Sequence, residues 1–394
     1  MANRSEKKNL GFETRAIRTQ ADRSGHREHS SSVYLTSSFL FDSAEHGRDL
    51  FSGNADGLIY SRYGNPNVDE FVEKLCLLEE CEDGVATATG MAAVFLTFTS
   101  LLSAGDHIVA SRALFGSTHR ILTAILPRFG ITASYPAADD PASLEAACTK
   151  ETKMMFVETP SNPGLKLFDI SACAEICRHR GLILAVDNCF AGPYLQNPAP
   201  LGADVVIHSA TKFIDGQGRV LGGAVLGSGG RIEPVRAFAR QTGPSMSPFN
   251  AWVLSKSLET LGPRMDRHCS NALAVAKYLE DHPSAKEVRY PFLPSHPQYD
   301  LAKRQMRSGG GLVTFCASGG TEAAMQFVNR LQMISRTSNL GDSRSIATHP
   351  ASTTHSSLTP EERRAAGIED GTIRISVGLE TAEDIIDDIA QALG

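Results

Sequence analysis

The sequence predicts an α/β protein with a mainly parallel sheet, helices on both faces of that sheet, and a smaller α+β domain at the carboxyl end. Its 394 residues exceed one ordinary domain of about 100 to 150 residues, so we expect two domains. Strand and helix patterns alternate from about residue 106 to 226, which is typical of a parallel sheet. After about residue 249 this alternation gives way to long helical patterns mixed with isolated strands.

Short apolar runs mark the expected strands, and apolar residues at helical spacing mark the expected helices. In the large domain the expected strands are His107–Ala110, Thr132–Tyr135, Met154–Val157, Leu182–Val186, Val205–Ile207 and Gly223–Leu226. The helices expected there are Val68–Glu80, His119–Phe129, Ser143–Cys148 and Ser171–Arg180. The C-terminal part is expected to contain helical stretches at Trp252–Leu261, Ala272–Leu279, Thr321–Leu331 and Thr381–Leu393, with strands at Gly311–Cys316 and Thr372–Gly378.

These patterns divide the chain into three parts. Residues 1–60 are rich in Arg, His, Ser and Asp with few apolar repeats, which predicts an extended arm that packs on a neighbouring subunit. Residues 61–255 form the predicted large domain and residues 256–394 the C-terminal α+β domain. Within the large domain, small residues from Gly84 to Gly90 predict a tight turn before an apolar helix, whose amino end would offer N–H groups to an anion.

The amino-acid composition indicates which broad classes of protein and partner can be excluded. The chain is 42% hydrophobic and 21% charged, as is usual for soluble proteins, and its net charge of −6 is spread without long single-sign blocks. We therefore expect neither nucleic acid nor membrane as a partner. The eight cysteines are scattered singly, which favours reduced thiols in the cytoplasm over disulfides or a metal site. We expect no secretory signal and no membrane span.

The stretch from Asp204 to Lys212 carries the strongest functional signal. Its β-branched run predicts a strand buried on both faces, so Lys212 is expected at the strand's carboxyl end, where sites in such sheets form. Two hydroxyls, Ser209 and Thr211, stand within three residues of this lysine. An amine that forms an imine, beside hydroxyls that hold a phosphate, explains this combination. The plain alternative is a strand-end lysine that reaches solvent.

Asp187 closes the apolar run Leu182–Val186 in the same way. A buried carboxylate needs a cation nearby, and a protonated pyridine nitrogen would supply one. Such an ion pair at about 4 Å is worth roughly 4 kcal/mol at an effective dielectric near 20, or about three pKa units. The alternative is that Asp187 caps the turn after it. Pyridoxal phosphate needs an imine lysine, an acid at the ring nitrogen and a phosphate cup, and the candidates for these are Lys212, Asp187, Gly90, Met91, Ser209, Thr211 and Arg62.

Six separate motifs in the chain resemble those of one known family, the Cys/Met-metabolism enzymes of the fold-type-I pyridoxal-phosphate class. They are Tyr60-Ser-Arg-Tyr-Gly-Asn-Pro66, Glu158-Thr-Pro-Ser-Asn-Pro163, Val186-Asp-Asn188, Ser209-Ala-Thr-Lys212, His349-Pro350 and Ile373-Arg-Ile-Ser-Val-Gly-Leu-Glu380. The resemblance covers almost the full chain. It implies the fold-type-I architecture with a seven-stranded type of large sheet and a pyridoxal 5'-phosphate cofactor.

The resemblance also implies roles for individual residues. Lys212 would bond to the cofactor, Asp187 would pair with its ring nitrogen, and Phe115 would stack on it. Its phosphate would be held by Gly90, Met91, Ser209 and Thr211. Tyr60 and Arg62 would reach the cofactor of the neighbouring subunit, in a homotetramer built from dimers that share active sites. The substrate would be bound by Arg374, Asn162 and Asn339, of which Asn162 would also contact the cofactor. Without the resemblance, Arg374 would be interpreted as an ordinary surface pair.

Two departures narrow the resemblance. Phe115 stands where many members of the family have tyrosine, so acid help for the leaving group would come from elsewhere, such as Tyr60 or Lys212. Arg344 stands where lyases and cystathionine synthases tend to have glutamate. With the segments 213–219 and 349–355, these departures make the chain most similar to the O-succinylhomoserine sulfhydrylases. Arg219 or Arg344 would then receive the succinyl carboxylate, and a structural salt bridge is the alternative for either.

The resulting hypothesis is a γ-replacement in which O-succinyl-L-homoserine and sulfide give L-homocysteine and succinate, with Lys212 moving the protons. The alternatives are cystathionine γ-synthase, an O-acetylhomoserine sulfhydrylase, and a catalytically silent cofactor-binding regulatory protein. Retention of both Lys212 and Arg374 speaks against the silent protein. A nicotinamide enzyme is disfavoured because Gly216-Gln-Gly218 lacks the full G-x-G-x-x-G spacing.

Overall fold

Two sheets form the framework of the computed structural model, which describes residues 7, 9–136, 138, 140–356, 358–365 and 367–394. The large sheet has seven strands in the order β1-β7-β6-β5-β4-β2-β3. The five strands from β6 to β3 run parallel, while β7 runs antiparallel to both of its neighbours. Its strands are β1 (Asp83–Thr87), β2 (His107–Ala110), β3 (Thr132–Ser134), β4 (Thr152–Glu158), β5 (Ile183–Asp187), β6 (Val205–Ser209) and β7 (Gly223–Gly227).

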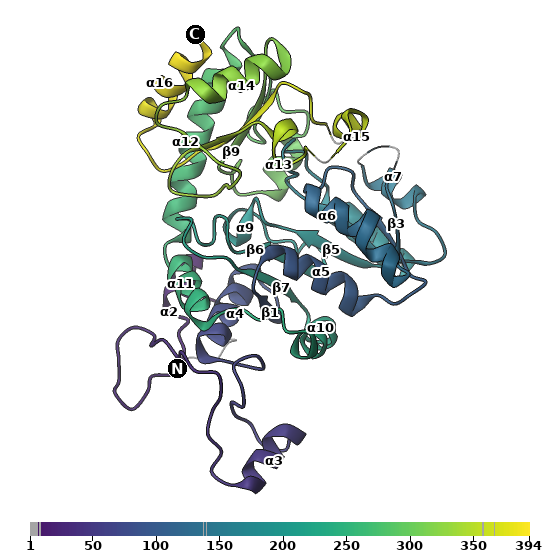
Figure 1. The fold of residues 1–394 in the computed structure, drawn as a ribbon, viewed down its shortest axis with the longest axis vertical. Coiled ribbons are helices and arrows are strands. Elements are labelled where there is room, and N and C mark those ends of the chain that lie inside the picture. Colours follow the sequence, from purple (N-terminus) through teal and green to yellow (C-terminus); the bar gives the residue numbers. More distant parts are fainter. Residues whose placement is uncertain (1–6, 8, 137, 139, 357, 366) are drawn as a thin grey trace.

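Helices cover both faces of this sheet, which confirms the predicted fold class (Figure 1). On one face, α5 and α10 pack against β1, β6 and β7. On the other, α4 packs against β1, and α8 against β4 and β5. The helices of this part are α4 (Pro66–Glu79), α5 (Gly90–Leu101), α6 (Gly116–Arg120), α7 (Pro141–Ala146), α8 (Ile170–Arg180), α9 (Gly192–Leu195), α10 (Gly229–Thr242) and α11 (Pro248–Leu258).

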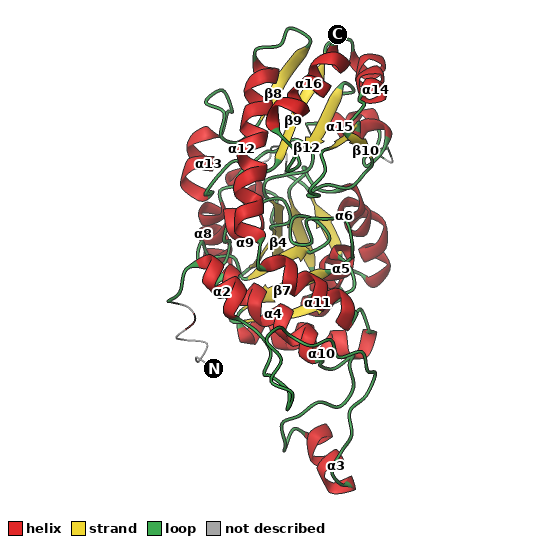
Figure 2. Cartoon of the chain, turned by 90° about the vertical axis from the view of Figure 1, so that its left-hand side faces the viewer, coloured by secondary structure: helices red, strands yellow, loops and turns green. Residues whose placement is uncertain are grey.

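The second sheet has five strands in the order β10-β11-β12-β9-β8, and only β10 and β11 pair in parallel. The long helix α12 (Leu261–Glu280) runs from the large sheet to this smaller one (Figure 2). The strands are β8 (Ala285–Arg289), β9 (Leu312–Ala317), β10 (Ser335–Arg336), β11 (Ile346–Thr348) and β12 (Thr372–Ser376). The other helices here are α13 (Tyr299–Gln305), α14 (Gly320–Arg330), the 3₁₀ turn η3 (Pro350–Ser352), α15 (Pro360–Ala365) and α16 (Ala382–Leu393).

Several elements differ from the sequence-based expectation. The predicted arm contains two helices, α2 (Phe12–Arg18) and α3 (Ala44–Ser52), and α2 packs against α4. The single helix predicted from His119 to Phe129 is instead α6 followed by a π-helical segment, η1 (Ile121–Ile125), and a 3₁₀ segment, η2 (Leu126–Phe129). Pro127 has no backbone N–H to continue an α-helical ladder, which explains the change.

The stretch interpreted as a tight turn after Gly84 is in fact strand β1. A side chain on Gly84 would collide with Leu226 of the paired strand β7, so glycine marks close packing there. Of the described helices, none combines the length and the apolar character needed to cross a membrane. The described residues also contain no group of three or more side chains that could hold a metal ion.

Candidate active site

A cavity of about 470 Å³ lies at the carboxyl ends of three neighbouring parallel strands, and residues 338–340, Thr354 and Arg374 of the C-terminal part complete its lining. Glu158, Asp187 and Ser209 are the last residues of β4, β5 and β6, and all three line it. This is the edge at which ligands bind in open α/β sheets. The predicted site residues that line the cavity are Gly90, Met91, Phe115, Asn162, Asp187, Ser209, Thr211, Lys212, Asn339 and Arg374.

Lys212 follows β6, and its side chain enters the cavity rather than solvent. Its Nζ donates a hydrogen bond to Oδ1 of Asn339 at 2.8 Å. Burial lowers the pKa of Lys212, and the positive charge of Arg374 lowers it further. A lowered pKa leaves more of the amine uncharged, and the uncharged amine is the form that attacks a carbonyl or takes up a proton.

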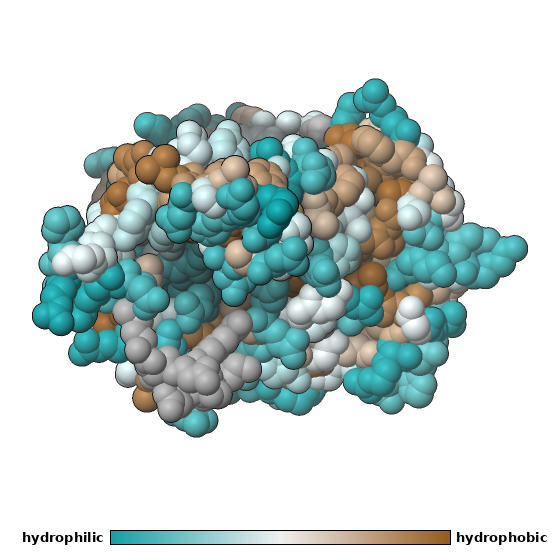
Figure 3. All heavy atoms as spheres, turned by 90° about the horizontal axis from the view of Figure 1, so that it is seen from below, coloured by the Kyte–Doolittle hydropathy of each residue, from teal (hydrophilic) through white to brown (hydrophobic). Residues whose placement is uncertain are grey.

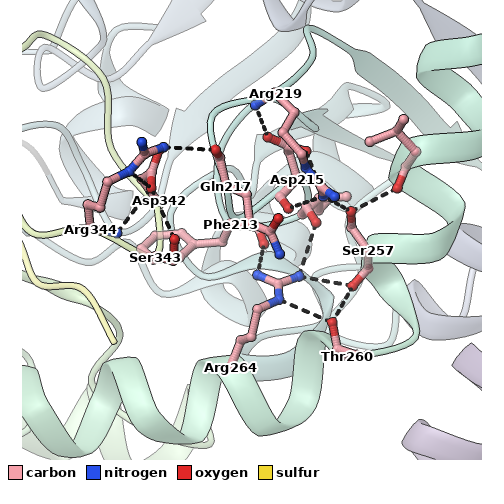
Figure 4. Close-up of polar contacts among 12 residues, drawn as sticks. Phe213, Asp215, Gln217, Arg219, Ser257, Thr260, Arg264, Asp342, Ser343 and Arg344 are labelled. Atoms are coloured by element: carbon pink, nitrogen blue, oxygen red, sulfur yellow. Dashed lines mark hydrogen bonds and ion pairs between the residues drawn. The ribbon is translucent and has the colours of Figure 1, made fainter. Parts of the chain in front are cut away.

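The loop behind Lys212 is held by a buried arginine on α12 (Figure 4). Arg264 donates from Nη1 to the carbonyl oxygen of Phe213 at 2.7 Å and from Nη2 to that of Ile214 at 3.1 Å. Gly216 has a φ of +69°, and a Cβ at that position would collide with the same guanidinium. The backbone that carries Lys212 is therefore fixed from the side opposite the cavity.

Asp187 closes β5 at the cavity wall, and its Oδ1 accepts a hydrogen bond from the backbone N–H of Cys189 at 3.0 Å. Burial raises the pKa of Asp187 to about 6, although that N–H group and the positive charge of His208 act in the opposite direction. A carboxylate placed there is stabilised by a cationic ligand group in the cavity, as a protonated ring nitrogen would be.

Glu158 stands beside Asp187, because β4 and β5 pair these two residues in register. Its Oε2 accepts the backbone N–H of Phe115 at 2.9 Å and its Oε1 that of Asn162 at 3.0 Å. Burial raises the pKa of Glu158 well above its usual range, and the neighbouring charge of Asp187 adds to the effect. Glu158 thus fixes the backbone of two predicted cofactor-contacting residues while favouring its own neutral form.

The amino end of α5 and the end of β6 together form a site suited to a phosphate. Thr89 caps α5: its hydroxyl accepts the N–H of Ala92 and its carbonyl oxygen that of Ala93, each at 3.1 Å, which leaves the N–H groups of Gly90 and Met91 for a ligand. A Cβ on Gly90 would lie 2.8 Å from Oγ and 2.9 Å from Cα of Ser209, so only glycine allows this close approach. The amino end of the helix and Ser209 line the same cavity, so the helix dipole and the Ser209 hydroxyl can act on one bound anion.

Arg374 on β12 is almost fully buried, with 1% of its surface exposed. Its Nη1 donates to Oδ1 of Asn162 at 3.0 Å, and its Nη2 donates to the carbonyl oxygens of Ser338 and Asn339 at 3.3 and 3.1 Å. Its Nε is buried without a hydrogen-bond partner. Among the residues that the structure describes, no carboxylate forms an ion pair with Arg374, so its charge is free to bind a carboxylate of the substrate.

Tyr60 and Arg62 are not brought to the cavity of their own chain. Tyr60 is 41% exposed, and Arg62 lies over the ring of Tyr63 at 4.7 Å, in a separate surface pocket. Their contact with the cofactor of a neighbouring subunit stays a prediction.

The two arginines considered for the succinyl carboxylate are both engaged elsewhere (Figure 4). Arg219 donates from Nε to Oδ1 of Asp215 at 3.1 Å. Arg344 donates from Nε and Nη2 to the two carboxylate oxygens of Asp342, at 2.9 Å each. Neither arginine lines the cavity, so the geometry favours the alternative of structural ion pairs.

Some cavity residues received no role from the sequence. Glu158 begins the motif Glu158–Pro163, and the signal that could have found it is an acid at the end of a strand that pairs with the strand of Asp187. Ser338 contributes its backbone carbonyl oxygen, which accepts a hydrogen bond from Arg374. Every residue has such a carbonyl group, so the sequence gives no sign of this role. Cys189 and Thr354 also line the cavity. In the sequence they come after the motifs Val186-Asp-Asn188 and His349-Pro350, respectively.

The residues of this cavity fit pyridoxal phosphate. Lys212 offers an amine, Asp187 an acid that gains from a cation, the amino end of α5 a phosphate site, and Arg374 a buried positive charge with an unused Nε.

Comparisons with known proteins agree with this arrangement. A family model described as "Cys/Met metabolism PLP-dependent enzyme" matches residues 13–394. The chain is 48% identical over 389 residues to the O-succinylhomoserine sulfhydrylase of Pseudomonas aeruginosa, covering 99% of this chain and 96% of that protein. It is 43% identical over 386 residues to the L-methionine gamma-lyase of Porphyromonas gingivalis, with 97% of each covered.

A solved structure of a putative O-acetylhomoserine (thiol)-lyase from Campylobacter jejuni, which contains a pyridoxyl-lysine, has a TM-score of 0.93 and 34% sequence identity. The match covers 98% of this chain and 100% of that one. That structure and this chain share the fold-type-I architecture. From the family match and these relatives, the chain belongs to the pyridoxal-phosphate-dependent enzymes of Cys/Met metabolism.

Proposed function

We propose that the enzyme catalyses γ-replacement on O-succinyl-L-homoserine, with sulfide as the nucleophile and L-homocysteine and succinate as products. Two relatives that are 48% and 49% identical to this chain are O-succinylhomoserine sulfhydrylases, which supports this proposal. The relatives also include methionine gamma-lyases, which makes cleavage of methionine the alternative to weigh. Both reactions begin at the same Cα and differ in the group that leaves Cγ.

Phe115 is the observation that favours the ester. It lines the cavity and has no hydroxyl, where many family members carry a tyrosine. A carboxylic acid has a pKa near 4, so succinate departs without a proton, whereas a thiol has a pKa near 8.5 and leaves more readily when an acid protonates it. A cavity without that phenol is therefore better suited to release a carboxylate than a thiolate.

The residues of the chain divide the work between two ends of the substrate. Arg374 binds the α-carboxylate and thereby sets Cα within reach of Lys212. Bound pyridoxal phosphate supplies the electron sink for the carbanion formed at Cα. Lys212 takes a proton from Cα and, after passing that proton to the bound cofactor, removes a second one from Cβ, which lets the group at Cγ leave; both protons return once the nucleophile has added. Asn339 orients the amine of Lys212 through the 2.8 Å hydrogen bond. Asp187 holds the proton on the ring nitrogen.

The bond changes balance without any further reactant. The Cγ–O bond of the ester breaks and succinate leaves with the electron pair, while a Cγ–S bond forms to hydrosulfide. The protons that Lys212 removed from Cα and Cβ are restored there after the sulfur has added, so the amine returns to its starting state. No oxidant or reductant is required.

We also propose that the active unit is a homotetramer of dimers that share active sites, located in the cytoplasm. Support for shared sites comes from the position of Tyr60 and Arg62 outside their own cavity. Seen from the end where the arm lies, the surface carries apolar patches among hydrophilic residues (Figure 3). In the arm, Leu35, Leu40 and Phe51 are 70%, 98% and 63% exposed, which favours contact with another subunit. Eight free cysteines fit a reducing compartment.

Mass spectrometry of product mixtures tests the reaction. The enzyme is incubated with O-succinyl- or O-acetyl-homoserine, each with sulfide, with cysteine, or with no thiol, and separately with methionine. We expect homocysteine from succinyl ester and sulfide to form fastest. A larger yield of cystathionine, of product from the acetyl ester, or of methanethiol from methionine would contradict the proposal and assign the corresponding alternative.

Omitting the thiol measures the competing elimination, which yields 2-oxobutanoate, ammonia and succinate. Introducing the missing phenol, with Phe115→Tyr, should raise methionine cleavage relative to ester replacement by about 10-fold, because one general acid is gained. An unchanged ratio would show that residue 115 does not select the leaving group. A cofactor spectrum that stays unchanged on adding ester would instead support a catalytically silent protein.

A further inference from the structure

Two loops meet beside the cavity: residues 212–218, which follow β6, and residues 338–344, which precede β11. Asn339 belongs to the second loop and contacts both sides of the cavity. Its Oδ1 accepts a hydrogen bond from Nζ of Lys212 at 2.8 Å, and its carbonyl oxygen accepts one from Nη2 of Arg374 at 3.1 Å. The position of loop 338–344 therefore decides where the amine of Lys212 is held.

The backbones of the two loops are in close contact. Gly341 has a φ of +74°, and a Cβ at that position would lie 2.5 Å from N of Phe213 and 2.8 Å from C of Lys212. Only glycine can lie this close to the peptide bond that follows Lys212. The N–H of Gly341 donates to Oγ of Ser376 at the end of β12 at 2.8 Å. Two residues beyond Asn339, the loop is thus fixed to β12 and packed against the backbone of Lys212.

Polar contacts join the loops further along (Figure 4). The N–H of Ser343 donates to the carbonyl oxygen of Gly216 at 2.9 Å, and Nη2 of Arg344 donates to that of Gln217 at 3.0 Å. Arg344 is held by Asp342, which accepts Nε and Nη2 at 2.9 Å each and the backbone N–H at 3.0 Å. Burial acts to raise the pKa of Asp342, but the hydrogen bonds from Arg344 lower it overall, so the carboxylate is charged. We call Asp342, Ser343 and Arg344 the loop clip.

The loop that receives these contacts is tightly folded around Lys212. The N–H of Gly216 donates to the carbonyl oxygen of Lys212 at 2.9 Å. Gly218 has a φ of +66°, and a Cβ there would lie 2.5 Å from Oδ2 of Asp342, so glycine allows the clip to approach. Arg264 holds the same loop from α12. The clip therefore acts on a rigid backbone that is directly bonded to Lys212.

We propose that Asp342 and Arg344 are positioning residues for the proton transfers. The loop clip holds loop 338–344 against loop 212–218 and thereby keeps Oδ1 of Asn339 in contact with the amine of Lys212. Neither Asp342 nor Arg344 lines the cavity, so both act through Asn339 rather than on the substrate. The inference rests on the proposed role of Lys212 as proton carrier and holds for either acyl donor.

The first test is the Arg344→Met holoenzyme. Methionine keeps an unbranched side chain and removes every donor, and the side chain of Arg344 is 64% exposed, so its loss leaves no cavity in the core. The readout is the exchange of the Cα proton of L-norvaline with deuterated water, followed by ¹H NMR. This amino acid has no group to lose from Cγ, so the rate reports on the first proton transfer alone. We expect the rate at saturation to fall about 10-fold, as for the loss of one hydrogen bond to a charged group.

The two esters separate positioning from substrate binding. In Arg344→Met, kcat should fall by the same factor for O-succinyl- and O-acetyl-homoserine. KM should stay within about threefold of wild type, because Arg374 keeps its contacts with Asn162 and Ser338. If Arg344 bound the succinyl carboxylate instead, KM would rise for the succinyl ester alone and the exchange of norvaline would be unchanged. That pattern would overturn the proposal.

A double-mutant cycle tests whether Arg344 acts through Asn339. Once Asn339→Ala has removed the contact with Lys212, the clip has no side chain left to position. The double variant Arg344→Met with Asn339→Ala should therefore exchange the Cα proton as slowly as Asn339→Ala alone. Multiplied effects would contradict the proposal, because the two residues would then act independently.

Two further variants complete the design. Asp342→Asn removes the charge that holds Arg344 and should slow the exchange in the same direction, by about threefold. Arg304→Met is the matched control, because Arg304 is also 64% exposed and is paired with a carboxylate, Asp169, at 2.6 Å, but does not line the cavity. It should exchange the Cα proton at the wild-type rate.

The outcomes for the clip and for the proposed function are distinguishable. Wild-type enzyme that exchanges the Cα proton, together with Arg344→Met and Asp342→Asn that exchange it equally fast, would overturn the clip alone. Wild-type enzyme that exchanges no Cα proton would overturn the proposed function, and the clip with it. An equal loss in Arg304→Met would show that the effect comes from any lost surface ion pair, which also contradicts the proposal.

Discussion

The two sides of the cavity place their charged side chains differently. On the large-sheet side, Asp187 and Lys212 stand at or just beyond the carboxyl ends of parallel strands, where side-chain charges meet the ligand. On the small-sheet side, Arg374 lies within an antiparallel strand and is oriented by the carbonyl oxygens of Ser338 and Asn339. We propose that the first side holds the groups for the cofactor and the second a group for the substrate carboxylate. Variants on the two sides should therefore have separable effects.

The largest effect is expected on the large-sheet side from Lys212→Ala. Without its amine no group remains to move the Cα proton, so turnover should fall by about 10⁴-fold. Product formation by the reconstituted variant measures it. Lys153→Ala, which removes an exposed lysine from β4, is the matched control and should retain wild-type turnover. If Lys212→Ala formed product at more than about a tenth of the wild-type rate, Lys212 would not be the proton carrier.

The next effect belongs to the small-sheet side. Arg374→Lys keeps the charge but loses the planar fork, so a hydrogen bond to the substrate carboxylate worth about 2 to 3 kcal/mol is lost. KM should rise about 30- to 150-fold, while kcat changes little and the cofactor spectrum stays as in wild type. Arg336→Lys, on exposed β10 of the same sheet, should leave KM unchanged. A spectral change in Arg374→Lys would break the division between the two sides.

The same division explains what could be predicted from the sequence. The parallel strands, and the positions of Asp187 and Lys212, follow from apolar runs that end in a polar residue. Arg374 has no such signal, because an arginine inside an antiparallel strand normally faces solvent, and only the family resemblance gave it a role. Strands β8, β10 and β11 were not predicted, since β10 and β11 are short and β8 is largely polar.

Local chemistry also limited the prediction. Helix α2 carries three charged residues among its seven, so its single buried residue, Ala16, gave no amphipathic signal before α4 was in place. The carbonyl groups that hold Arg374, and the carbonyl group of Gln217 that accepts from Arg344, come from residues far from these arginines in the chain. Such networks depend on tertiary contacts that no local pattern encodes.

A third prediction returns to the large-sheet side and concerns space rather than charge. Gly90→Ala places a methyl group against Ser209, so the amino end of α5 must move away from the phosphate site. Overpacking of this kind costs about 1 to 3 kcal/mol, and cofactor affinity should fall about 5- to 150-fold, measured by equilibrium titration of the apoenzyme. Gly229→Ala also changes the first residue of a helix, α10, but has open space around it and should bind cofactor normally. Equal affinities for both variants would contradict the proposed phosphate site.

The smallest effect is expected in the protein without cofactor, where the buried carboxylate of Asp187 lowers the free energy of unfolding. Its pKa is near 3.8 in the unfolded chain and about 6 in the folded apoenzyme, so the folded state binds more protons between these values. The free energy of unfolding therefore decreases as pH rises from about 4 to about 6 and stays lower above that. Asp187→Asn removes this penalty and should stabilise the apoenzyme by about 1 to 3 kcal/mol at pH 8, but not at pH 4.

Denaturant unfolding of apoenzyme and holoenzyme at both pH values tests the sign. In the holoenzyme the order should reverse, because wild-type Asp187 gains a cationic partner that asparagine cannot stabilise equally. An acid that lowers stability alone and raises it with the cofactor is the behaviour expected of a residue kept for binding. If Asp187→Asn destabilised the apoenzyme at pH 8, the carboxylate would be a structural group of the large sheet, and the division between the two sides of the cavity would need to be redrawn.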